Sequence, residues 1–464
     1  MWHWLLPLIW ISGWFCIPHL LLLNKRPTAT LAWLWALILF PIVGPALYLM
    51  IGSEQIKRSR MERRRDFRGS GPASSSARKE RCGPADPFLE SLAVITQLPV
   101  STGKNIQVLR KAPAFYASLQ ADIRQAKDHV HISTFIWRDD EVGKEFLDLL
   151  IATVHRGVTV RVLIDELGSL KLKRNYFQPL VDAGGQFSWC HTLSPLRSRY
   201  SFNLRNHRKL QVIDGATAYV GGMNFGREYL GRDPVDGDWG DTQVRVEGPV
   251  VDILQEIFAE DWFFGTGKDE IRAAMERDPS EETTCVQVLR GGPDEEDHPM
   301  LRINLAMIAQ ARNRLWIGTG YFVPGEIMQT ALQVAVARGV DVRLLISQKS
   351  EHPLLVKAGR SYYDALLRQG VRIYEYSKGI EHSKYIIIDD DLVSVGSSNL
   401  DERSMRLNFE LSLLMRCPKT NCEVADIFSA TIANSKEIDR KAFAERPYWE
   451  KLMESALRPL SPVL

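Results

Sequence analysis

His207-Arg-Lys-Leu-Gln-Val-Ile-Asp214 returns later in the chain as His382-Ser-Lys-Tyr-Ile-Ile-Ile-Asp389. Both copies continue to a glycine-led segment that ends in asparagine, at Gly221-Gly222-x-Asn224 and at Gly396-Ser397-x-Asn399. Six positions matched at identical spacing in two places are very unlikely to arise by chance. The doubled pattern therefore sets the main hypothesis, which is phosphodiester chemistry performed by two histidines.

The repeat extends well beyond this motif. Ile106-Gln-Val-Leu-Arg110 returns as Val286-Gln-Val-Leu-Arg290, and the segment Arg156–Ile164 returns almost unchanged as Arg338–Ile346. Self-similarity of this kind indicates duplicated structural units, and a chain of 464 residues is long enough for two of them. The sequence therefore predicts two homologous halves, at residues 104–268 and 283–464.

Each half alternates helical and strand patterns. A helix-like segment at Lys144–His155 precedes an apolar, β-branched run at Val158–Ile164, and Glu326–Ala337 precedes Val340–Ile346 in the same way. Strands interleaved with helices are typical of layered α/β domains built around a buried sheet. We expect two such α/β sandwich domains that face each other across a pseudo-twofold axis, with one copy of the motif from each half in a shared cleft.

The candidate catalytic residues are the charged and imidazole members of the two motifs, which are His207, Lys209, Asp214, His382, Lys384 and Asp389. Each motif reads as a strand entering the core, where residues i and i+2 share one face. Each histidine is therefore expected on the same side as its lysine. The two aspartates lie at odd offsets from the histidines, so parity favours a turn or salt-bridge role for them.

The motifs also predict a phosphate site that needs no metal. Its expected ligands are two lysines and two asparagines, Lys209, Asn224, Lys384 and Asn399, and the glycines before each asparagine allow close backbone approach. Neither half supplies a carboxylate cluster of metal-ligand type, and the six cysteines show no zinc-finger spacing. No metal and no other cofactor is expected.

Each histidine needs an acid that holds its tautomer and stabilises the imidazolium. Following the duplication downstream, Asp241-Thr-Gln-Val-Arg-Val aligns with Glu410-Leu-Ser-Leu-Leu-Met, and each acid opens an alternating or apolar strand. We therefore predict Asp241 and Glu410 as the orienting acids. The alternative is that either is an ordinary charge at a strand edge.

Two uncharged runs occupy the N-terminal region, from Trp2 to Leu23 and from Thr28 to Ser53. Each is long enough to cross about 30 Å of hydrocarbon as a helix, so a transmembrane helical hairpin is expected within residues 1–56. A cleaved signal peptide is the alternative for the first run. Pro41, Gly44 and Pro45 are expected to kink the second helix, which leaves a re-entrant hairpin possible.

Positive charge is concentrated just after this hairpin, in a region predicted as a basic juxtamembrane linker at residues 57–103. Residues 57–81 contain ten Lys or Arg against three Asp or Glu, whereas the chain from residue 82 onward carries a net charge of −6. The positive-inside rule then places the two halves in the cytoplasm, and the basic cluster can lie against anionic headgroups. A solvated linker fits the Gly69–Ala77 part equally well. The acidic remainder is a poor binder of nucleic acid.

These features resemble the phospholipase D superfamily and, within it, the bacterial cardiolipin synthases. The paired motif is specific for the superfamily, whereas the hairpin and several flanking segments point to the synthase branch. Those segments are Lys25-Arg26-Pro27, Pro41-x-x-Gly44, Tyr321-Phe-Val-Pro324, Arg360-Ser-Tyr-Tyr363, Asn399-Leu-Asp-Glu-Arg-Ser404 and Asn408-Phe-Glu410. The chain departs from the usual family pattern at Gly240, where Arg is usual, and at Gly320, where Pro is usual.

The resemblance implies a phosphatidyltransferase that moves a phosphatidyl group from one phosphatidylglycerol to another and yields cardiolipin and glycerol. It implies a phosphatidyl-histidine intermediate on His207, with His382 as the general acid and base. The implied location is the bacterial cytoplasmic (inner) membrane, as a multi-pass protein whose catalytic domains face the cytoplasm. Its implied partners are phosphatidylglycerol and anionic membrane lipids and no nucleic acid, and the sequence predicts no oligomeric state.

Other functions are compatible with parts of this pattern. A hydrolytic phospholipase D, or a phosphatidyltransferase that uses phosphatidylethanolamine or another alcohol, would need the same catalytic residues. A nuclease of the same superfamily is disfavoured by the apolar N-terminal runs and the acidic remainder. A non-enzymatic membrane scaffold would tolerate loss of a motif histidine or lysine, yet both motifs are intact.

Overall fold

The structure covers most of both predicted halves and part of the N-terminal region. This computed structural model describes residues 15–23, 27–40, 42–48, 86–190, 204–231, 237–268, 271, 283–295 and 297–461. Parts of the predicted hairpin, and residues 57–85 of the predicted basic linker, lie outside the described residues.

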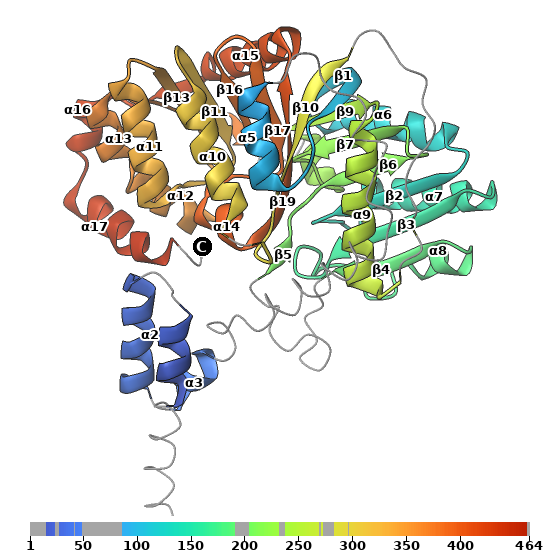
Figure 1. Ribbon diagram of the computed structural model, residues 1–464, viewed down its shortest axis with the longest axis horizontal. Coiled ribbons are helices and arrows are strands. Elements are labelled where there is room, and N and C mark those ends of the chain that lie inside the picture. The colour runs from blue at the N-terminus through green and yellow to red at the C-terminus, as the bar shows by residue number, and fades with distance from the viewer. Residues whose placement is uncertain are drawn as a thin grey trace, which may run out of the picture.

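Strands and helices alternate along the first half (Figure 1). Its strands are β1 (Ser101–Arg110), β2 (His129–Thr134), β3 (Thr159–Asp165), β4 (Gln186–Cys190), β5 (Arg205–Asn206), β6 (Leu210–Ile213), β7 (Thr217–Gly221), β8 (Asp238–Gly240) and β9 (Thr242–Glu247). Its helices are α6 (Ala112–Gln125), α7 (Glu141–His155), α8 (Gln178–Asp182), the short 3-10 helix η3 (Arg227–Leu230) and α9 (Val250–Thr266). The helix and strand predicted at Lys144–His155 and Val158–Ile164 are α7 and β3, each within three residues.

The second half repeats this order. Its strands are β10 (Thr284–Gly291), β11 (Arg314–Thr319), β12 (Phe322–Val323), β13 (Asp341–Ser347), β14 (Arg372–Tyr376), β15 (Gly379–Glu381), β16 (Tyr385–Ile388), β17 (Leu392–Gly396), β18 (Leu400–Asp401), β19 (Asn408–Arg416) and β20 (Ser435–Glu437). Its helices are α10 (Pro299–Gln310), α11 (Gly325–Ala337), α12 (Pro353–Arg360), α13 (Tyr363–Gln369), α14 (Glu402–Arg406), α15 (Pro418–Ile432), α16 (Arg440–Ala444), α17 (Tyr448–Leu457) and the 3-10 helix η4 (Arg458–Leu460). The predicted α/β architecture with two similar halves is confirmed.

One mixed sheet passes through both halves, in the strand order β20-β14-β13-β11-β16-β17-β19-β10-β1-β9-β7-β6-β2-β3-β4, with β5 attached to β19. Apart from β20 and β5, this order pairs each strand of one half with its repeat counterpart at the same distance from the centre. The centre is the antiparallel pair β1–β10, where Ser101 lies opposite Val286. The halves are therefore joined edge to edge, which fits the predicted pseudo-twofold arrangement.

The two halves also share a hydrophobic core. One cluster of buried side chains takes in α9 and strands β6, β7 and β9 of the first half together with α15 and strands β10, β16, β17 and β19 of the second. Strands β6 and β16, which lie between the lysine and the aspartate of each motif, are buried along their whole length. Their apolar runs, rather than an alternating pattern, are what a sheet covered on both faces requires. The strands that carry the motifs are thus fixed in the interior.

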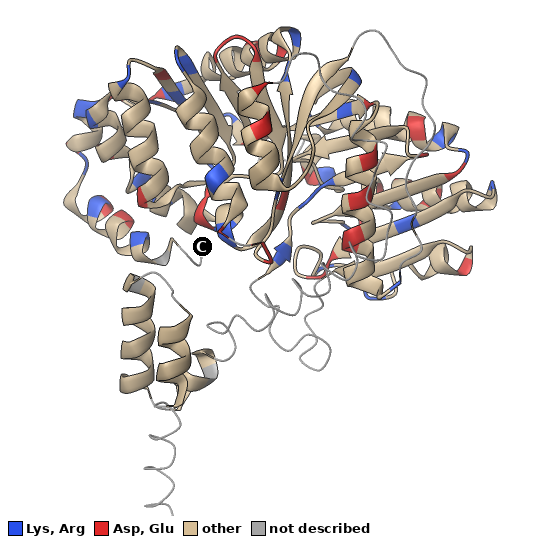
Figure 2. Cartoon of the chain, viewed as in Figure 1, with Lys and Arg blue, Asp and Glu red and all other residues tan. Residues whose placement is uncertain are grey.

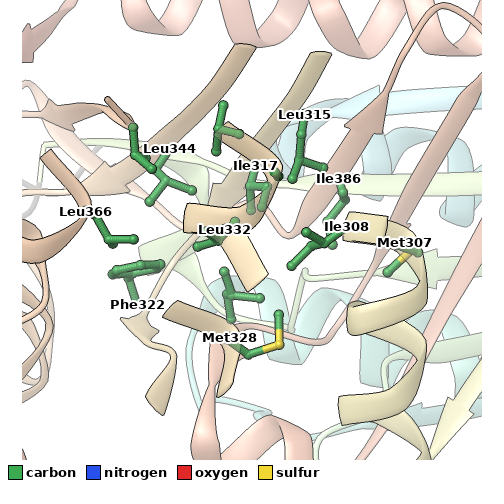
Figure 3. Packing of buried hydrophobic residues seen from close by; sticks show 14 of the residues in the cluster. Met307, Ile308, Leu315, Ile317, Phe322, Met328, Leu332, Leu344, Leu366 and Ile386 are labelled. Carbon is green, nitrogen blue, oxygen red and sulfur yellow. The ribbon is translucent and has the colours of Figure 1, made fainter. Parts of the chain in front are cut away.

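Helix α5 (Pro87–Thr96) falls within the predicted linker but packs on the second half. Its N-terminus is capped by the side chain of Asp86, which accepts the backbone N–H of Phe88 at 2.9 Å, and Pro87 fits the first helical position. Its buried residues Leu89 and Leu92 join the second-half core, part of which Figure 3 shows around Leu332 and Met328. The predicted linker boundary at residue 103 is therefore wrong, because residues 86–103 are folded against the domains.

The described N-terminal residues form short apolar helices at residues 15–22, α2 (Pro27–Leu39) and α3 (Val43–Leu47). Figure 2 shows no charged residue on α2 or α3. Leu20, Leu37 and Tyr48 form a small buried cluster, and His19 Nδ1 lies 2.7 Å from the hydroxyl of Tyr48. A Cβ on Gly44 would lie 2.3 Å from the carbonyl oxygen of Ala36, so glycine permits this close packing after the break between α2 and α3.

None of the described helices combines the length and the apolar character needed to cross a bilayer. The predicted second span, Thr28–Ser53, is interrupted where α2 ends at Leu39 and α3 begins at Val43. Residues 1–14, 24–26, 41 and 49–56 of the predicted hairpin lie outside the described residues.

Truncating Leu92 to alanine tests the attachment of α5 to the second half. Leu92 is fully buried, so Leu92→Ala is expected to lower the free energy of unfolding by about 2–5 kcal/mol through lost transfer energy and a cavity. Val94, on the same helix, is 77% exposed, and Val94→Ala is expected to change the free energy of unfolding by less than about 0.5 kcal/mol. Urea unfolding followed by tryptophan fluorescence measures both variants, and equal effects would contradict the packing described.

Candidate active site

The two motif histidines are held by short strands that cross between the halves. Strand β5, just before His207, pairs in parallel with β19 of the second half, and β15, just before His382, pairs in parallel with β8 of the first half. The backbone N–H of His207 then donates to the carbonyl oxygen of Phe409 at 3.0 Å, and that of His382 donates to the carbonyl oxygen of Gly240 at 2.7 Å. Each histidine is thus placed by the opposite half.

Each histidine meets an acid from the opposite half. His207 Nδ1 lies 3.0 Å from both carboxylate oxygens of Glu410, and His382 Nδ1 lies 2.8 Å from Oδ2 of Asp241. Both acids are fully buried, and each histidine is less than a tenth exposed. The two predicted acids are therefore in contact with the histidines, and the pairing runs across the halves, which the sequence does not show.

The glycine-led segment of each motif lies against an acid and not against a histidine. In the second half, Ser397 Oγ donates to Oε2 of Glu410 at 2.5 Å, and Asn408 Nδ2 donates to Oε1 at 3.2 Å. In the first half, a Cβ on Gly222 would lie 2.2 Å from Oδ1 of Asp241. The Gly/Ser difference between the two copies is therefore explained, because the hydroxyl fits beside Glu410 and no side chain fits beside Asp241.

The two lysines are buried beside their histidines, but residues 207–209 and 382–384, predicted to begin strands, form the loops just before β6 and β16. Lys209 Nζ donates to the carbonyl oxygen of His207 at 2.8 Å, whereas Lys384 Nζ lies 2.6 Å from His382 Nδ1 and also contacts the carbonyl oxygen of His382. Burial lowers the pKa of Lys209 to about 7 and that of Lys384 to about 8, against the nearby carboxylates that favour the charged forms. In their protonated forms the two lysines place positive charge beside the histidines, and Asp241 and Glu410 offset part of it.

Burial also controls the protonation of the histidines. It lowers the pKa of His382 to about 4, with Lys384 acting in the same direction and Asp241 opposing it. It lowers the pKa of His207 as well, although Glu410 opposes this and limits the shift. Both rings are therefore neutral at pH 7 in the absence of a ligand.

The two Nδ1 atoms have different surroundings. His207 Nδ1 faces only carboxylate oxygens among the hydrogen-bonding atoms of the described residues, so it carries the proton and leaves a lone pair on Nε2. His382 Nδ1 faces both a carboxylate oxygen and the ammonium of Lys384, which compete for opposite tautomers. The tautomer of His207 is therefore better defined than that of His382.

The two motif asparagines differ in how they are used. Asn224 accepts the backbone N–H of Ile136 at 3.1 Å and donates to the hydroxyl of Tyr229 at 3.2 Å, which leaves one amide N–H for a phosphate oxygen. Asn399 Oδ1 is buried and has no hydrogen-bond partner among the described residues. Because Oδ1 can only accept a hydrogen bond, a phosphate oxygen would have to be bound by Nδ2 of Asn399.

Asp214 and Asp389 are not part of the histidine site. Asp214 accepts the backbone N–H groups of residues 127–129 at 2.8–2.9 Å, just before β2. Asp389 accepts those of residues 312–314 at 2.7–3.2 Å, just before β11. Both have positive φ, as turn residues do. Their inclusion among the candidate catalytic residues is corrected accordingly, and the parity argument for a turn role describes them properly.

Several residues around the histidines were not singled out from the sequence. Arg208 lies between His207 and Lys209 and donates to Oδ1 of Asp261 on α9 at 2.7 Å. This hydrogen bond anchors the segment that carries His207 to α9. The rings of Phe135 and Tyr321 lie edge-on to His207 and His382, with centroids 5.1 and 5.7 Å apart. Phe135 directly follows β2, and Gly320 directly follows β11, at equivalent positions of the repeat. Aligning the two halves at these strand ends could therefore have identified this region from the sequence.

The two departures from the usual family pattern both lie around His382. A Cβ on Gly320 would lie 2.7 Å from His382 Cδ2, and a Cβ on Gly240 would lie 2.2 Å from Oε2 of Glu381. A side chain at either position would clash with His382 itself or with Glu381, the residue just before it. The described residues include no group of three or more His, Cys, Asp or Glu arranged to hold a metal ion.

Comparisons with known proteins identify the family to which the chain is similar. A family model described as "Cardiolipin synthase, PLD-like domain" matches residues 119–262 and 305–432, and one described as "Phospholipase_D-nuclease N-terminal" matches residues 4–53. A cardiolipin synthase of Geobacillus kaustophilus (strain HTA426) is 36% identical over 95% of this chain and 90% of its own length. Cardiolipin synthase 2 of Bacillus anthracis is 36% identical over 95% of this chain and 88% of its own length.

A solved structure shares the fold. The crystal structure of a phosphatidylserine synthase from Haemophilus influenzae Rd KW20 has a TM-score of 0.61 to this chain and 16% sequence identity, and the match covers 82% of this chain and all of that one.

Replacing Glu410 by glutamine tests the electrostatics of the first histidine. The carboxylate favours the imidazolium, so Glu410→Gln is expected to move the pKa of His207 still further below 6.5, whereas Ser397→Ala keeps the carboxylate and is expected to move it much less. NMR titration of ¹⁵N-histidine-labelled protein measures this pKa, with the signal assigned by its loss in His207→Gln. A pKa that rises in Glu410→Gln would contradict the pairing.

Proposed function

The chain belongs to the cardiolipin synthase family of phospholipase D-like proteins, and we propose that it transfers a phosphatidyl group from one phosphatidylglycerol to a second, giving cardiolipin and glycerol. The observation that carries this proposal is the pair of buried histidines, each set against an acid of the opposite half and beside a buried lysine. Such a site offers one nucleophile, one acid and two cations to a single phosphodiester.

In the first step, the lone pair of His207 Nε2 forms a bond to phosphorus while the bond from phosphorus to the glycerol oxygen breaks. The proton on His382 passes to the departing oxygen. Glu410 supports this step because it holds Nδ1–H and stabilises the positive charge that develops on the His207 ring. The product is a phosphatidyl-histidine and free glycerol.

His382 must be protonated for this step, although its pKa is about 4 in the absence of a ligand. A bound phosphodiester brings a negative charge next to the ring, and a nearby opposite charge favours the imidazolium, so substrate binding raises the pKa of His382. The same anion raises the pKa values of the two lysines and keeps them charged. Substrate and proton are therefore expected to bind together.

In the second step, neutral His382 takes the proton from the terminal hydroxyl of a second phosphatidylglycerol. The hydroxyl oxygen forms a bond to phosphorus, and the bond from phosphorus to His207 breaks. Lys209 and Lys384 hold the non-bridging oxygens in both steps, with Asn224 and Asn399 as further donors. One phosphodiester replaces another, so the reaction needs no nucleotide.

A transferase must keep water from intercepting the intermediate, so its site should be lined by apolar groups. The rings of Phe135, Tyr321 and Trp239 lie around the two histidines, with Trp239 5.6 Å from His382. This lining favours a lipid hydroxyl over water as the second nucleophile and thus favours transfer over hydrolysis.

We propose that the N-terminal region attaches the enzyme to the bacterial cytoplasmic membrane, with the catalytic halves on the cytoplasmic side. The two uncharged runs, the match of residues 4–53 to an N-terminal family model and the exposed apolar side chains of α2 support attachment. The excess of Lys and Arg in residues 57–81 supports the orientation and a contact with anionic lipids.

Purified protein incubated with labelled phosphatidylglycerol alone is expected to form cardiolipin and one free glycerol for each transfer. His207→Ala and His382→Ala should each lower the rate by at least about a thousandfold, because each removes a group that makes or breaks a bond to phosphorus. Asp364→Ala, a change at an exposed helical carboxylate remote from the histidines, is the control and should keep the rate. Phosphatidic acid as the sole product would refute the transferase proposal.

Acid quenching of the reaction followed by peptide mass spectrometry is expected to place the phosphatidyl adduct on the peptide that contains His207. The reason is the unambiguous tautomer of His207, whose Nδ1 faces only Glu410. An adduct on His382 would reverse the assignment of the two histidines while leaving the transfer chemistry intact.

A further inference from the structure

Helix α17 turns an apolar face away from the protein. Tyr448, Trp449, Leu452 and Met453, here called the α17 face, lie on one side of the helix, and Tyr448 and Trp449 are 69% and 70% exposed. The residue of α17 that is buried against the domain is Glu454, which accepts from Arg446 at 2.8 Å. This is the reverse of an ordinary surface helix, whose apolar side faces the core.

The α17 face is a fixed surface and not a frayed end. Helix α17 packs against α12, and the chain after it is held where Ser461 bonds the hydroxyl of Tyr362 at 3.1 Å and Arg458 lies 4.7 Å from the ring centroid of Tyr362. Tyr362 and Ser461 are both buried. The exposed side chains are therefore presented on a rigid support.

Helix α12, on which α17 packs, begins close to the residues around His382. Leu354 at the start of α12 is 53% exposed, and His352 just before it lies 6.0 Å from the ring of Tyr321. Tyr321 in turn lies 5.7 Å from the ring of His382. Helix α12 thus lies between the α17 face and a chain of ring contacts, from His352 through Tyr321, that ends at His382.

We propose that the α17 face and Leu354 form a second membrane contact, which lies in the headgroup region of the bilayer and holds the histidine cleft over its lipid substrate. Tryptophan and tyrosine favour that interface, and an amphipathic helix with an outward apolar face lies in its plane. In Figure 1, α17 lies at the edge of the second half toward α2 and α3, so both apolar regions are at the same end of the molecule. The proposal rests on the proposed function for the identity of the lipid substrate.

Charge plays a small part in this contact. Residues 439–458 contain five Lys or Arg and four Asp or Glu. Binding through the α17 face should therefore come from insertion of apolar side chains and depend only weakly on salt and on anionic lipid, in contrast to a contact made by the basic residues 57–81.

The first test is the depth of the α17 face in the full-length protein, because the N-terminal region alone would keep any variant on a vesicle. The protein with Cys422→Ser and Met453→Cys is labelled with a nitrobenzoxadiazole dye and reconstituted in vesicles of phosphatidylcholine and phosphatidylglycerol that contain acyl-chain spin-labelled lipid. Insertion predicts quenching of the dye by roughly twofold or more. A dye on Val94→Cys, at an exposed position on α5, is the matched control and should be quenched little.

The second test separates lipid access from catalysis. Trp449→Asp with Leu452→Asp is expected to lower the rate on phosphatidylglycerol in vesicles by about tenfold or more, and to leave the rate on dispersed short-chain phosphatidylglycerol within about twofold. Val94→Asp should leave both rates unchanged. Equal loss on both substrates would overturn the proposal, because the helix would then serve the fold or the cleft itself.

Other outcomes also decide the question. A dye at position 453 that is shielded but not quenched by lipid, with a dimer that dissociates in Trp449→Asp, would show that a second copy of the chain covers this face. If the unaltered protein makes no cardiolipin from either form of phosphatidylglycerol, the proposed function fails, whereas lipid quenching at position 453 still supports the membrane contact.

Discussion

The hydrogen bond from each histidine to an acid of the opposite half is the interaction on which the rest of the site depends. It requires that β5 lie on β19 and that β15 lie on β8, since these pairings bring the histidine and the acid-bearing strand together. It also requires the central β1–β10 pair and the shared core, which fix the two halves as one body. Neither half by itself contains both members of a histidine–acid pair, so each pair forms only when the two halves are joined.

Burial sets the chemistry of this site. Removing two histidines and two lysines from water disfavours their charged forms, which keeps the histidines neutral at pH 7 and lowers the lysine pKa values to about 7 and 8. The two fully buried acids are tolerated because each lies against its histidine and accepts further hydrogen bonds, Glu410 from Ser397 and Asn408 and Asp241 from the backbone N–H of Thr242. A bound phosphodiester would favour the charged forms that burial suppresses, so substrate binding and proton uptake are expected to be coupled.

The two halves are similar but not equivalent. A serine supports Glu410 where glycine faces Asp241, and the ammonium of Lys384 reaches an imidazole nitrogen where that of Lys209 bonds only to backbone. The second half also carries α12 and α17, and α12 begins close to the residues around His382. These differences suit a reaction in which one histidine holds the lipid and the other handles the proton of each incoming or departing alcohol.

The alternation of helical and strand patterns in the sequence determined the α/β class. Alignment of the repeat determined the division into two halves, the paired histidines and lysines, and the two candidate acids. Asp214 and Asp389 were still predicted among the catalytic residues, although their odd offset from the histidines favoured a turn role; their hydrogen bonds to backbone N–H groups and their positive φ place them in turns. Only the tertiary structure decided which acid serves which histidine, how Arg208 is held by Asp261, and that residues 86–103 belong to the folded body. Those contacts join residues far apart in the chain, and no local pattern of spacing or polarity records which distant surfaces will meet.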